Sequence, residues 1–348
     1  MTPIFIALSL LLASCTVPPR PAVTETGTAT DATLPTAELS VAPVSTVPAP
    51  VTATPTPMPS LTPDIKKWCD LTDASFLNRG WGDSRCDEFR WNHVRNSAGG
   101  VAIPWVVFGD EADLDTKNVT LIMCGVHGDE ITPVKFCYDI LYDLKDFHWD
   151  FTGRVVVVAP LVSPDSYFTA RPSRTNGRGV DVNRNFPTRD WDGQALKLWK
   201  ERYRRDKRRF PGHEAMSEQE VIFQVNLIKR YRPSKIISVH SPLSMLDYDG
   251  PDLRHADTRT AKDLLLSMSE KAEGYKVSNY PHFPGSLGNW AGLELGIPTY
   301  TLELPNTDAR QSDRFWKQFR EAIHHAIEHR IGPTPAAPAD AAASAKAQ

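Results

Sequence analysis

Residues 119–130 read Val-Thr-Leu-Ile-Met-Cys-Gly-Val-His-Gly-Asp-Glu. The apolar run predicts a buried β-strand over residues 119–124, bounded by a glycine-containing turn. His127 and Glu130 lie three residues apart on that turn, so both side chains can converge on one ion. A histidine and a glutamate at this spacing also occur by chance. A hydrogen-bonded turn histidine is therefore the alternative to a metal ligand here.

Two further apolar runs each lead to another histidine or glutamate. Ile236-Ile237-Ser238-Val239 leads into His240, and Glu303 lies in the run Leu302-Glu303-Leu304-Pro305. Two histidines and a carboxylate are the protein ligands of a catalytic zinc that keeps a fourth position for water. A further carboxylate that does not bind the metal is what such a water needs as a base. The set of His127, Glu130, His240 and Glu303 therefore predicts one catalytic zinc and a metal-assisted hydrolysis.

The stretch 173–187 concentrates arginine and asparagine side chains after the apolar run 155–159; it reads Ser-Arg-Thr-Asn-Gly-Arg-Gly-Val-Asp-Val-Asn-Arg-Asn-Phe-Pro. A guanidinium group donates two parallel hydrogen bonds to a planar carboxylate. A solvated loop is the alternative, but beside a zinc candidate the pattern favours a clamp for an anion.

Taken together, these motifs resemble the zinc carboxypeptidase family, and most of all its bacterial murein tripeptide amidase and dl-carboxypeptidase branch. The resemblance covers roughly residues 95–328. It rests on HGDE (127–130), on RTNGRGVDVNRNFP (174–187), on the SVH and TLELP strand ends, and on the opening stretch SAGGVAIP (97–104). The segment from Phe210-Pro211-Gly212 to Glu220 is similar to a stretch of the bacterial branch.

The resemblance implies a role for each matching residue. His127, Glu130 and His240 match the zinc ligands, Arg174 the arginine that stabilises the oxyanion, and Glu303 the general base and acid. Asn183 and Arg184 match the pair that binds the free carboxylate of the substrate. Tyr280 lies near the spacing of a mobile tyrosine in other members, but its surroundings differ and it receives no role.

The substrate that this resemblance implies is a peptide or muropeptide. The expected bond is γ-D-glutamyl–diaminopimelate in a peptidoglycan stem peptide. A carboxypeptidase for ordinary exported peptides is one alternative. A wall-binding lipoprotein without activity is another, although the complete ligand set argues against it.

Apolar strand-like runs alternate with helical patterns, which indicates an α/β fold. We expect one carboxypeptidase-like domain over residues 64–332, with a central mixed sheet flanked by helices. Strands are predicted at 103–108, 119–124, 155–159, 235–240 and 299–304, and helices at 133–144, 217–229, 259–272 and 314–329. Ser217 and Glu220 have capping-box spacing, so Glu218 and Glu220 are interpreted as capping and helix-dipole groups rather than as catalysts.

The ends of the chain do not resemble a domain. Residues 1–15 combine an apolar run with Leu12-Ala13-Ser14-Cys15, which resembles a bacterial lipobox in which Cys15 carries lipid. Residues 16–63 hold eleven prolines and four charged residues and read as a disordered linker, and 333–348 as a tail. We therefore expect an exported lipoprotein anchored to a membrane.

Composition adds little to this picture. The formal net charge of −3 gives no reason to expect nucleic acid as a partner, and the oligomeric state stays open. Export permits disulfides. Cys69 and Cys86 are the better pair because they flank a polar, glycine-containing segment, and a short irregular region gains most from a crosslink. Cys124 and Cys137 are either bonded or buried thiols.

Three other groups of residues could carry function. Residues 197–209 hold eight basic residues and two acidic ones. A solvated helix face is favoured there over contact with an anionic polymer, with Trp199 and Tyr203 packing on the domain. Asp247 and Asp249 form either a turn or a site for a substrate ammonium group. Three histidines near the end of the chain are interpreted as lying on a surface helix; they are His324, His325 and His329.

Overall fold

The computed structural model describes residues 60–255 and 258–332. The predicted signal peptide with Cys15, the tail and all but the last four residues of the predicted linker lie outside these ranges. Pro63, placed in the linker from sequence, is the first residue of a helix that Thr62 caps. Within the described residues, no helix is both long and apolar enough to cross a bilayer.

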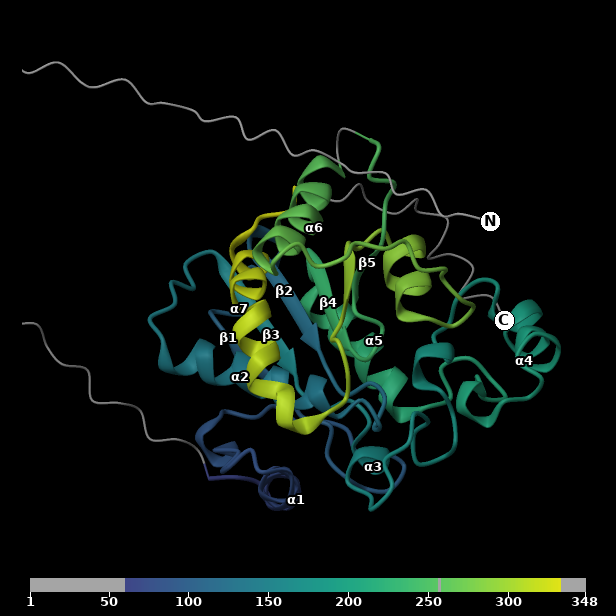
Figure 1. Cartoon of the computed structure of the whole chain (residues 1–348), viewed down its shortest axis with the longest axis horizontal. Coiled ribbons are helices and arrows are strands. Elements are labelled where there is room, and N and C mark those ends of the chain that lie inside the picture. The colour runs from purple at the N-terminus through teal and green to yellow at the C-terminus, as the bar shows by residue number, and fades with distance from the viewer. Residues whose placement is uncertain (1–59, 256–257, 333–348) are drawn as a thin grey trace, which may run out of the picture. The chain divides into compact units, whose positions relative to one another are not determined.

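A six-stranded mixed sheet forms the centre of the described part, in the order β1-β3-β2-β4-β6-β5 (Figure 1). The strands are β1 (Val106–Phe108), β2 (Asn118–Met123), β3 (Arg154–Ala159), β4 (Lys235–His240), β5 (Met245–Asp249) and β6 (Thr299–Glu303). The inner strands β3, β2, β4 and β6 pair in parallel, while β1 and β5 run antiparallel at the edges. The predicted α/β fold with a mixed sheet is confirmed.

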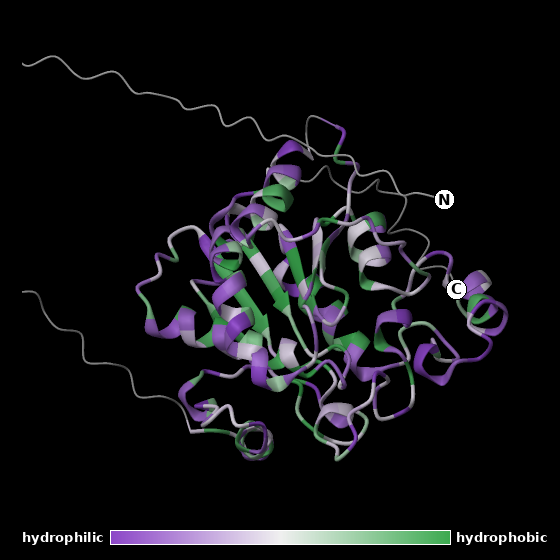
Figure 2. Cartoon of the chain, viewed as in Figure 1, coloured by the Kyte–Doolittle hydropathy of each residue, from purple (hydrophilic) through white to green (hydrophobic). Residues whose placement is uncertain are grey.

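Both faces of the sheet are covered, which explains the continuous apolar runs of the inner strands. Helices α2, α6 and α7 pack on one face around Ile122, Ile237 and Leu302, and α5 covers the other around Leu121 and Ile236 (Figure 1). The strands are accordingly the most hydrophobic part of the molecule (Figure 2).

The α-helices are α1 (Pro63–Arg79), α2 (Ile131–Asp146), α3 (Pro164–Tyr167), α4 (Leu196–Glu201), α5 (Gln219–Tyr231), α6 (Arg259–Lys271) and α7 (Ser312–Glu328). The segments η4 (Trp191–Ala195) and η7 (Gly288–Glu294) are π-helical. The 3-10 helices are η1 (Cys86–Glu88), η2 (Leu114–Thr116), η3 (Val182–Arg184), η5 (Lys207–Arg209) and η8 (Ala309–Gln311). Each predicted strand and helix overlaps an observed one.

Helix α1 and strand β5 were not predicted from the sequence. The predicted bond between Cys69 and Cys86 is present, and the segment between them is helical up to Arg79 and irregular only over residues 80–85. Cys124 and Cys137 are also bonded, which joins the end of β2 to α2. All four cysteines are buried in the hydrophobic core cluster that also contains the apolar residues of α2.

The predicted capping box at the start of α5 was wrong. Glu218 is the N-cap residue and makes no side-chain capping bond, and the Ser217 hydroxyl donates to Glu218 instead. The carboxylates of Glu218 and Glu220 both accept hydrogen bonds from the Asn176 side chain, at 2.8 and 2.9 Å. These buried carboxylates therefore hold the arginine-rich loop in place. Burial also raises the pKa of Glu220 to about 7.

Candidate active site

The ends of three parallel strands bring the predicted zinc ligands and the base together. His127 and Glu130 follow β2, His240 ends β4, and Glu303 ends β6 directly opposite His240 in the register. Strand order reverses between β2 and its neighbours β3 and β4, and ligands bind at the carboxyl ends of strands at such a point. Gly125 permits the sharp turn after β2, because its φ is +60° and a β-carbon there would lie 2.7 Å from Leu161.

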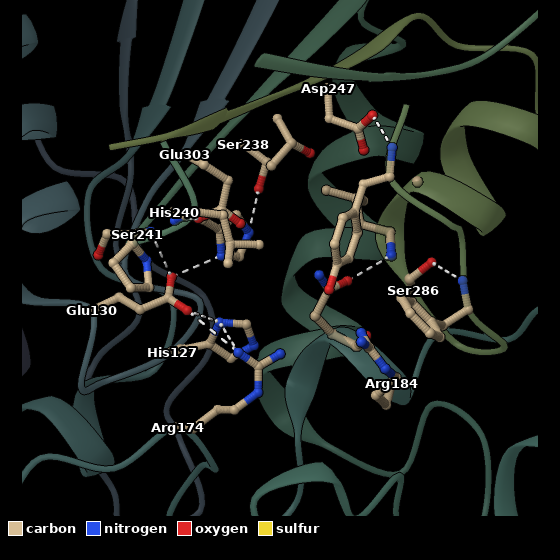
Figure 3. Close-up of a pocket in the computed structure, with 18 of the residues that line it drawn as sticks. His127, Glu130, Arg174, Arg184, Ser238, His240, Ser241, Asp247, Ser286 and Glu303 are labelled. Carbon is tan, nitrogen blue, oxygen red and sulfur yellow. Dashed lines mark hydrogen bonds and ion pairs between the residues drawn. The ribbon is translucent and has the colours of Figure 1, made fainter. Parts of the chain in front are cut away.

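His127, Glu130 and His240 form a buried cluster whose ligand atoms all lie within 4.8 Å of one another. His127 Nδ1 lies 2.7 Å from one Glu130 oxygen, and His240 Nδ1 lies 2.9 Å from the other (Figure 3). Burial alone would raise the pKa of Glu130. His127 and His240 lower it by more, so the pKa lies below its usual range and the carboxylate stays ionised. Two imidazoles and one carboxylate are the donor set of a catalytic zinc.

The remaining ring nitrogens of both histidines have partners within the protein. Asp181 Oδ1 lies 3.0 Å from His127 Nε2, and Ser238 Oγ lies 3.0 Å from His240 Nε2. Burial opposes ionisation of Asp181, but Arg174 and His127 keep its pKa well below the usual range. An ionised carboxylate only accepts hydrogen bonds, so with a metal bound Asp181 would hold the proton of His127 on Nε2 and leave the lone pair of Nδ1 to the metal. The protein therefore fits a zinc ion at these residues.

Arg174 lies beside the cluster and is held by the same aspartate. Its Nε donates to Asp181 Oδ2 at 2.9 Å, and its Nη1 lies 3.4 Å from Glu130 (Figure 3). The guanidinium is thereby fixed beside the residues that would hold the metal. Sequence reasoning missed Asp181 because it stood within a motif read for its arginine and asparagine groups. Asp181 is the one aspartate of that motif, so it could have been sought there as the partner of the histidine.

Asn183 and Arg184 lie on η3, as expected for residues that bind one substrate group. Asn183 Oδ1 accepts the backbone N–H of Leu287 at 2.8 Å. The Arg184 guanidinium carbon lies 4.3 Å from the centre of the Phe283 ring, and its buried Nε has no partner among the described residues. An unpaired buried donor is suited to an incoming anion. Gly285 is needed here, because a β-carbon would lie 2.0 Å from the Arg184 carbonyl oxygen.

Glu303 faces the metal ligands from β6 (Figure 3). Its carboxylate accepts the backbone N–H of Leu243 at 3.3 Å. Burial raises the pKa of this carboxyl; His240 opposes the rise and Glu130 adds to it. A raised pKa in a carboxylate beside a metal site suits a group that must both take up and return a proton.

A cavity of about 530 Å³ contains all of the predicted site residues of the described chain: His127, Glu130, Arg174, Asn183, Arg184, His240 and Glu303. Asp247 and Asp249 also line it, and they lie on β5, so the alternative of a turn at these residues was wrong. Residues two apart on a strand share one face. Burial, reinforced by the neighbouring Asp247, raises the pKa of Asp249 to about 7. Tyr280 lies at the cavity, 41% exposed, and its backbone N–H donates to Asp247.

Part of the basic segment, residues 197–209, also reaches the cavity. Arg208 and Arg209 line it, and Arg208 donates to Asp129 at 2.7 Å. The helix in this segment is short, so the interpretation as one solvated helix face was wrong for Arg208 and Arg209. Trp199 does pack on the protein, with its ring centroid 4.8 Å from that of Phe210.

The histidines near the end of the chain lie apart from the site. His324 lies 2.7 Å from Asp143, and His329 lies 2.8 Å from the carbonyl oxygen of Thr260. In the described ranges, the cluster at His127 is the one group of side chains arranged to hold a metal.

Comparison with known proteins agrees with this geometry. The model of the zinc carboxypeptidase family matches residues 85–327. Murein peptide amidase A of Escherichia coli (strain K12) is 29% identical over 219 residues, which is 61% of this chain and 80% of that protein. The crystal structure of murein-tripeptide amidase from Escherichia coli O157 has a TM-score of 0.50 at 25% identity, covering 70% of this chain and 94% of that chain.

A further solved structure supports the fold alone. Carboxypeptidase A from Helicoverpa armigera has a TM-score of 0.57 at 16% identity, covering 76% of this chain and 71% of that chain. The family match spans more than half of the chain and contains the whole zinc site together with Glu303. The chain therefore belongs to the zinc carboxypeptidase family.

Proposed function

We propose that this zinc metallopeptidase hydrolyses the γ-D-glutamyl–diaminopimelate bond of peptidoglycan stem peptides. One observation carries the proposal: the same cavity holds the Asn183–Arg184 clamp and the carboxylates of Asp247 and Asp249. A terminal diaminopimelate has an α-carboxylate for the clamp and a side-chain ammonium for the aspartates. The murein peptide amidases to which the chain is similar act, by name, on murein peptides.

The chain's own residues can carry out the hydrolysis. Zinc bound at this site supplies a Lewis acid, which polarises the scissile carbonyl and lowers the pKa of a water. Glu303 takes the proton from the attacking water and gives it to the leaving amine. Arg174, fixed by Asp181, donates to the carbonyl oxygen as negative charge develops on it. Asn183 and Arg184 hold the carboxylate of the leaving residue and so place the scissile bond.

Asp247 and Asp249 set the preference within this site. Both carboxylates are largely buried, so a neutral aliphatic side chain would leave their negative charge without a cationic partner. A site built to pair a polar group rejects an analogue that lacks this group, because the buried groups of the protein are then left unpaired. The site should therefore favour diaminopimelate over norleucine, which lacks both the ammonium group and the second carboxylate of the diaminopimelate side chain.

The test is digestion of three stem peptides by the full chain, followed by mass spectrometry. They are L-Ala-γ-D-Glu-diaminopimelate, the same peptide ending in norleucine, and the tetrapeptide extended by D-alanine. We expect the diaminopimelate tripeptide to be cleaved fastest, and Asp247→Asn to lose its advantage over the norleucine peptide. Asp252→Asn is the matched control, because the carboxylate of Asp252 is exposed.

Two results would contradict the proposal. Equal cleavage of tripeptide and tetrapeptide at the γ-D-glutamyl bond would indicate an endopeptidase. Faster release of lysine from an ordinary α-linked peptide than cleavage of either stem peptide would favour the second candidate, a carboxypeptidase for ordinary exported peptides. Asp247 and Asp249 are the observation that favours this second candidate, because the pair would bind the ammonium group of a C-terminal lysine as well.

We also propose that Cys15 carries a lipid that anchors the exported protein to a membrane. The sequence Leu12-Ala13-Ser14-Cys15 supports this, and the two disulfides fit an oxidising compartment. Cys15→Ser should move the protein from the detergent phase to the aqueous phase and leave the kcat of the soluble protein unchanged. Unaltered partitioning would reject the anchor.

A further inference from the structure

Arg184 and Asp247 lie across the cavity from His127, Glu130 and Arg174 (Figure 3). Arg184, stacked on Phe283, and the aspartates of β5 belong to the side that binds the leaving residue in the proposed function. Because the scissile bond must lie at the metal, the acyl half has to extend past the ligands in another direction. Asp129 and Arg208 line the cavity and have no part in the mechanism described above.

Asp129 ties Arg208 to the metal site. It directly precedes the ligand Glu130, and its backbone N–H donates to the carbonyl oxygen of Ser173, next to Arg174. Its Oδ2 accepts from Arg208 Nη1 at 2.7 Å, while its Oδ1 is buried without a partner among the described residues. The pair therefore lies beside the oxyanion arginine, with one aspartate oxygen available to a donor.

The segment that carries Arg208 is anchored at two points of the cavity rim. Arg208 contacts Asp129 on one side, whereas Tyr203 lies 6.4 Å from Phe283, measured between ring centroids, on the other. Arg209 packs over Tyr203 with its guanidinium carbon 4.6 Å from the ring centroid. These contacts position Arg208, whose Nη1 is the one guanidinium nitrogen paired with another side chain of the described residues. A guanidinium has five N–H donors in a planar fork, so it can bind a second carboxylate while it stays paired.

We propose that Arg208 binds a free carboxylate on the acyl side of the scissile bond, namely the α-carboxylate of a γ-linked glutamyl residue. This inference rests on the proposed function and deepens it. In a γ-linked residue, two methylene groups and the α-carbon separate this carboxylate from the scissile carbonyl. An α-linked peptide offers a carboxylate at this spacing only where the acyl residue is itself a glutamate. Arg208 is thus a specificity-determining residue that selects a glutamyl residue with a free carboxylate on the acyl side.

The experiment compares two substrates that differ in one group. L-Ala-γ-D-Glu-diaminopimelate carries the α-carboxylate, and L-Ala-γ-D-isoglutaminyl-diaminopimelate carries a carboxamide of nearly the same shape. We expect the wild type to show a kcat/KM about tenfold higher for the carboxylate, as suits a charge-assisted hydrogen bond at a partly exposed site. Arg208→Gln should lose this preference by slowing on the carboxylate alone. The wild-type preference should also shrink as salt is added.

Arg230→Gln is the matched control. Arg230 is an exposed arginine paired with Glu111 at 3.1 Å, and neither residue lines the cavity. This variant should retain the wild-type preference, and Arg208→Gln should keep its zinc content and melting temperature because its side chain is exposed.

Failure of this inference differs from failure of the proposed function. Equal kcat/KM on both substrates by the wild type, or an equal loss on both in Arg208→Gln, would overturn the role of Arg208 alone. No cleavage of either substrate by the zinc-loaded wild type would overturn the proposed function and this inference with it.

Discussion

Single side chains at this site serve more than one partner. Asp181 contacts the zinc ligand His127 with one oxygen and Arg174 with the other, so it couples the metal to the group that stabilises the oxyanion. Ser238 supports only His240, through a neutral contact. A charged hydrogen bond to a metal-bound histidine raises the basicity of the ligand more than a neutral one does.

Asp181→Asn should therefore weaken zinc binding by about 10–100-fold, with a smaller effect for Ser238→Ala. The asparagine keeps the shape of the side chain but lacks the charge that orients His127 and Arg174. Competition with a coloured chelator measures the affinity. If Asp181→Asn binds zinc as tightly as the wild type, the partner of His127 plays no part in holding the metal.

Glu303→Gln should keep the zinc and lose turnover. Positioned acid–base groups contribute about 10²–10⁴-fold, and one that serves both proton transfers should reach that range or exceed it. Zinc analysis and kcat on the preferred stem peptide provide the two readouts. Near-normal kcat in the zinc-loaded variant would move the base to another residue.

At the scale of elements, the unit from β2 to α2 carries the metal site. The disulfide Cys124–Cys137 closes 13 residues around the turn that bears His127 and Glu130, whereas Cys69–Cys86 closes 17 residues in α1 and the segment that follows it. Both loops are short and of similar length, so loop-closure entropy predicts similar stabilisation.

Replacing both cysteines of either pair by alanine should lower the free energy of unfolding by about 3 kcal/mol. Only the Cys124 and Cys137 variant should also weaken zinc binding, because it frees the turn that holds two of the ligands. Urea unfolding and zinc titration of both double variants test this. An equal loss of zinc affinity in the Cys69 and Cys86 variant would show that the effect is a general loss of stability.

At the scale of the whole molecule, a residue that recognises the substrate in the cavity, Asp249, lowers the stability of the folded protein. An unfolded aspartate titrates near 3.9, but Asp249 in the folded protein titrates at about 7 because it is buried beside Asp247. The folded state thus binds more protons between these values. The contribution of Asp249 to stability falls as the pH rises from about 4 to 7.

Asp249→Asn should consequently stabilise the substrate-free protein at pH 8 by roughly 1–3 kcal/mol and have little effect near pH 4. The same variant should cleave the diaminopimelate tripeptide more slowly at pH 8. Asp252→Asn, whose carboxylate lies at the surface, is the control for a generic loss of charge. A melting temperature that is lower at pH 8 than that of the wild type would contradict this reading of Asp249.

Sequence alone determined the chemistry and the class of fold. Apolar runs that are buried on both faces stand out without tertiary knowledge, and the ligands at their ends followed directly from them. Residues such as Glu303 and Arg174 were predicted through the family resemblance and lie in one cavity in the structure. Zinc ligation restricts residue type and local spacing strongly enough to be read from a linear pattern.

Tertiary structure decided which distant side chains share a partner. The antiparallel pairing of β5 with β6 turned Asp247 and Asp249 towards the cavity, although their local sequence also fits a turn. Glu218 and Glu220 were predicted to cap a helix but hold Asn176, more than forty residues away. The contact between Arg208 and Asp129 spans 79 positions. Such pairings depend on the register of strands and the path of loops, which no local pattern of residues encodes.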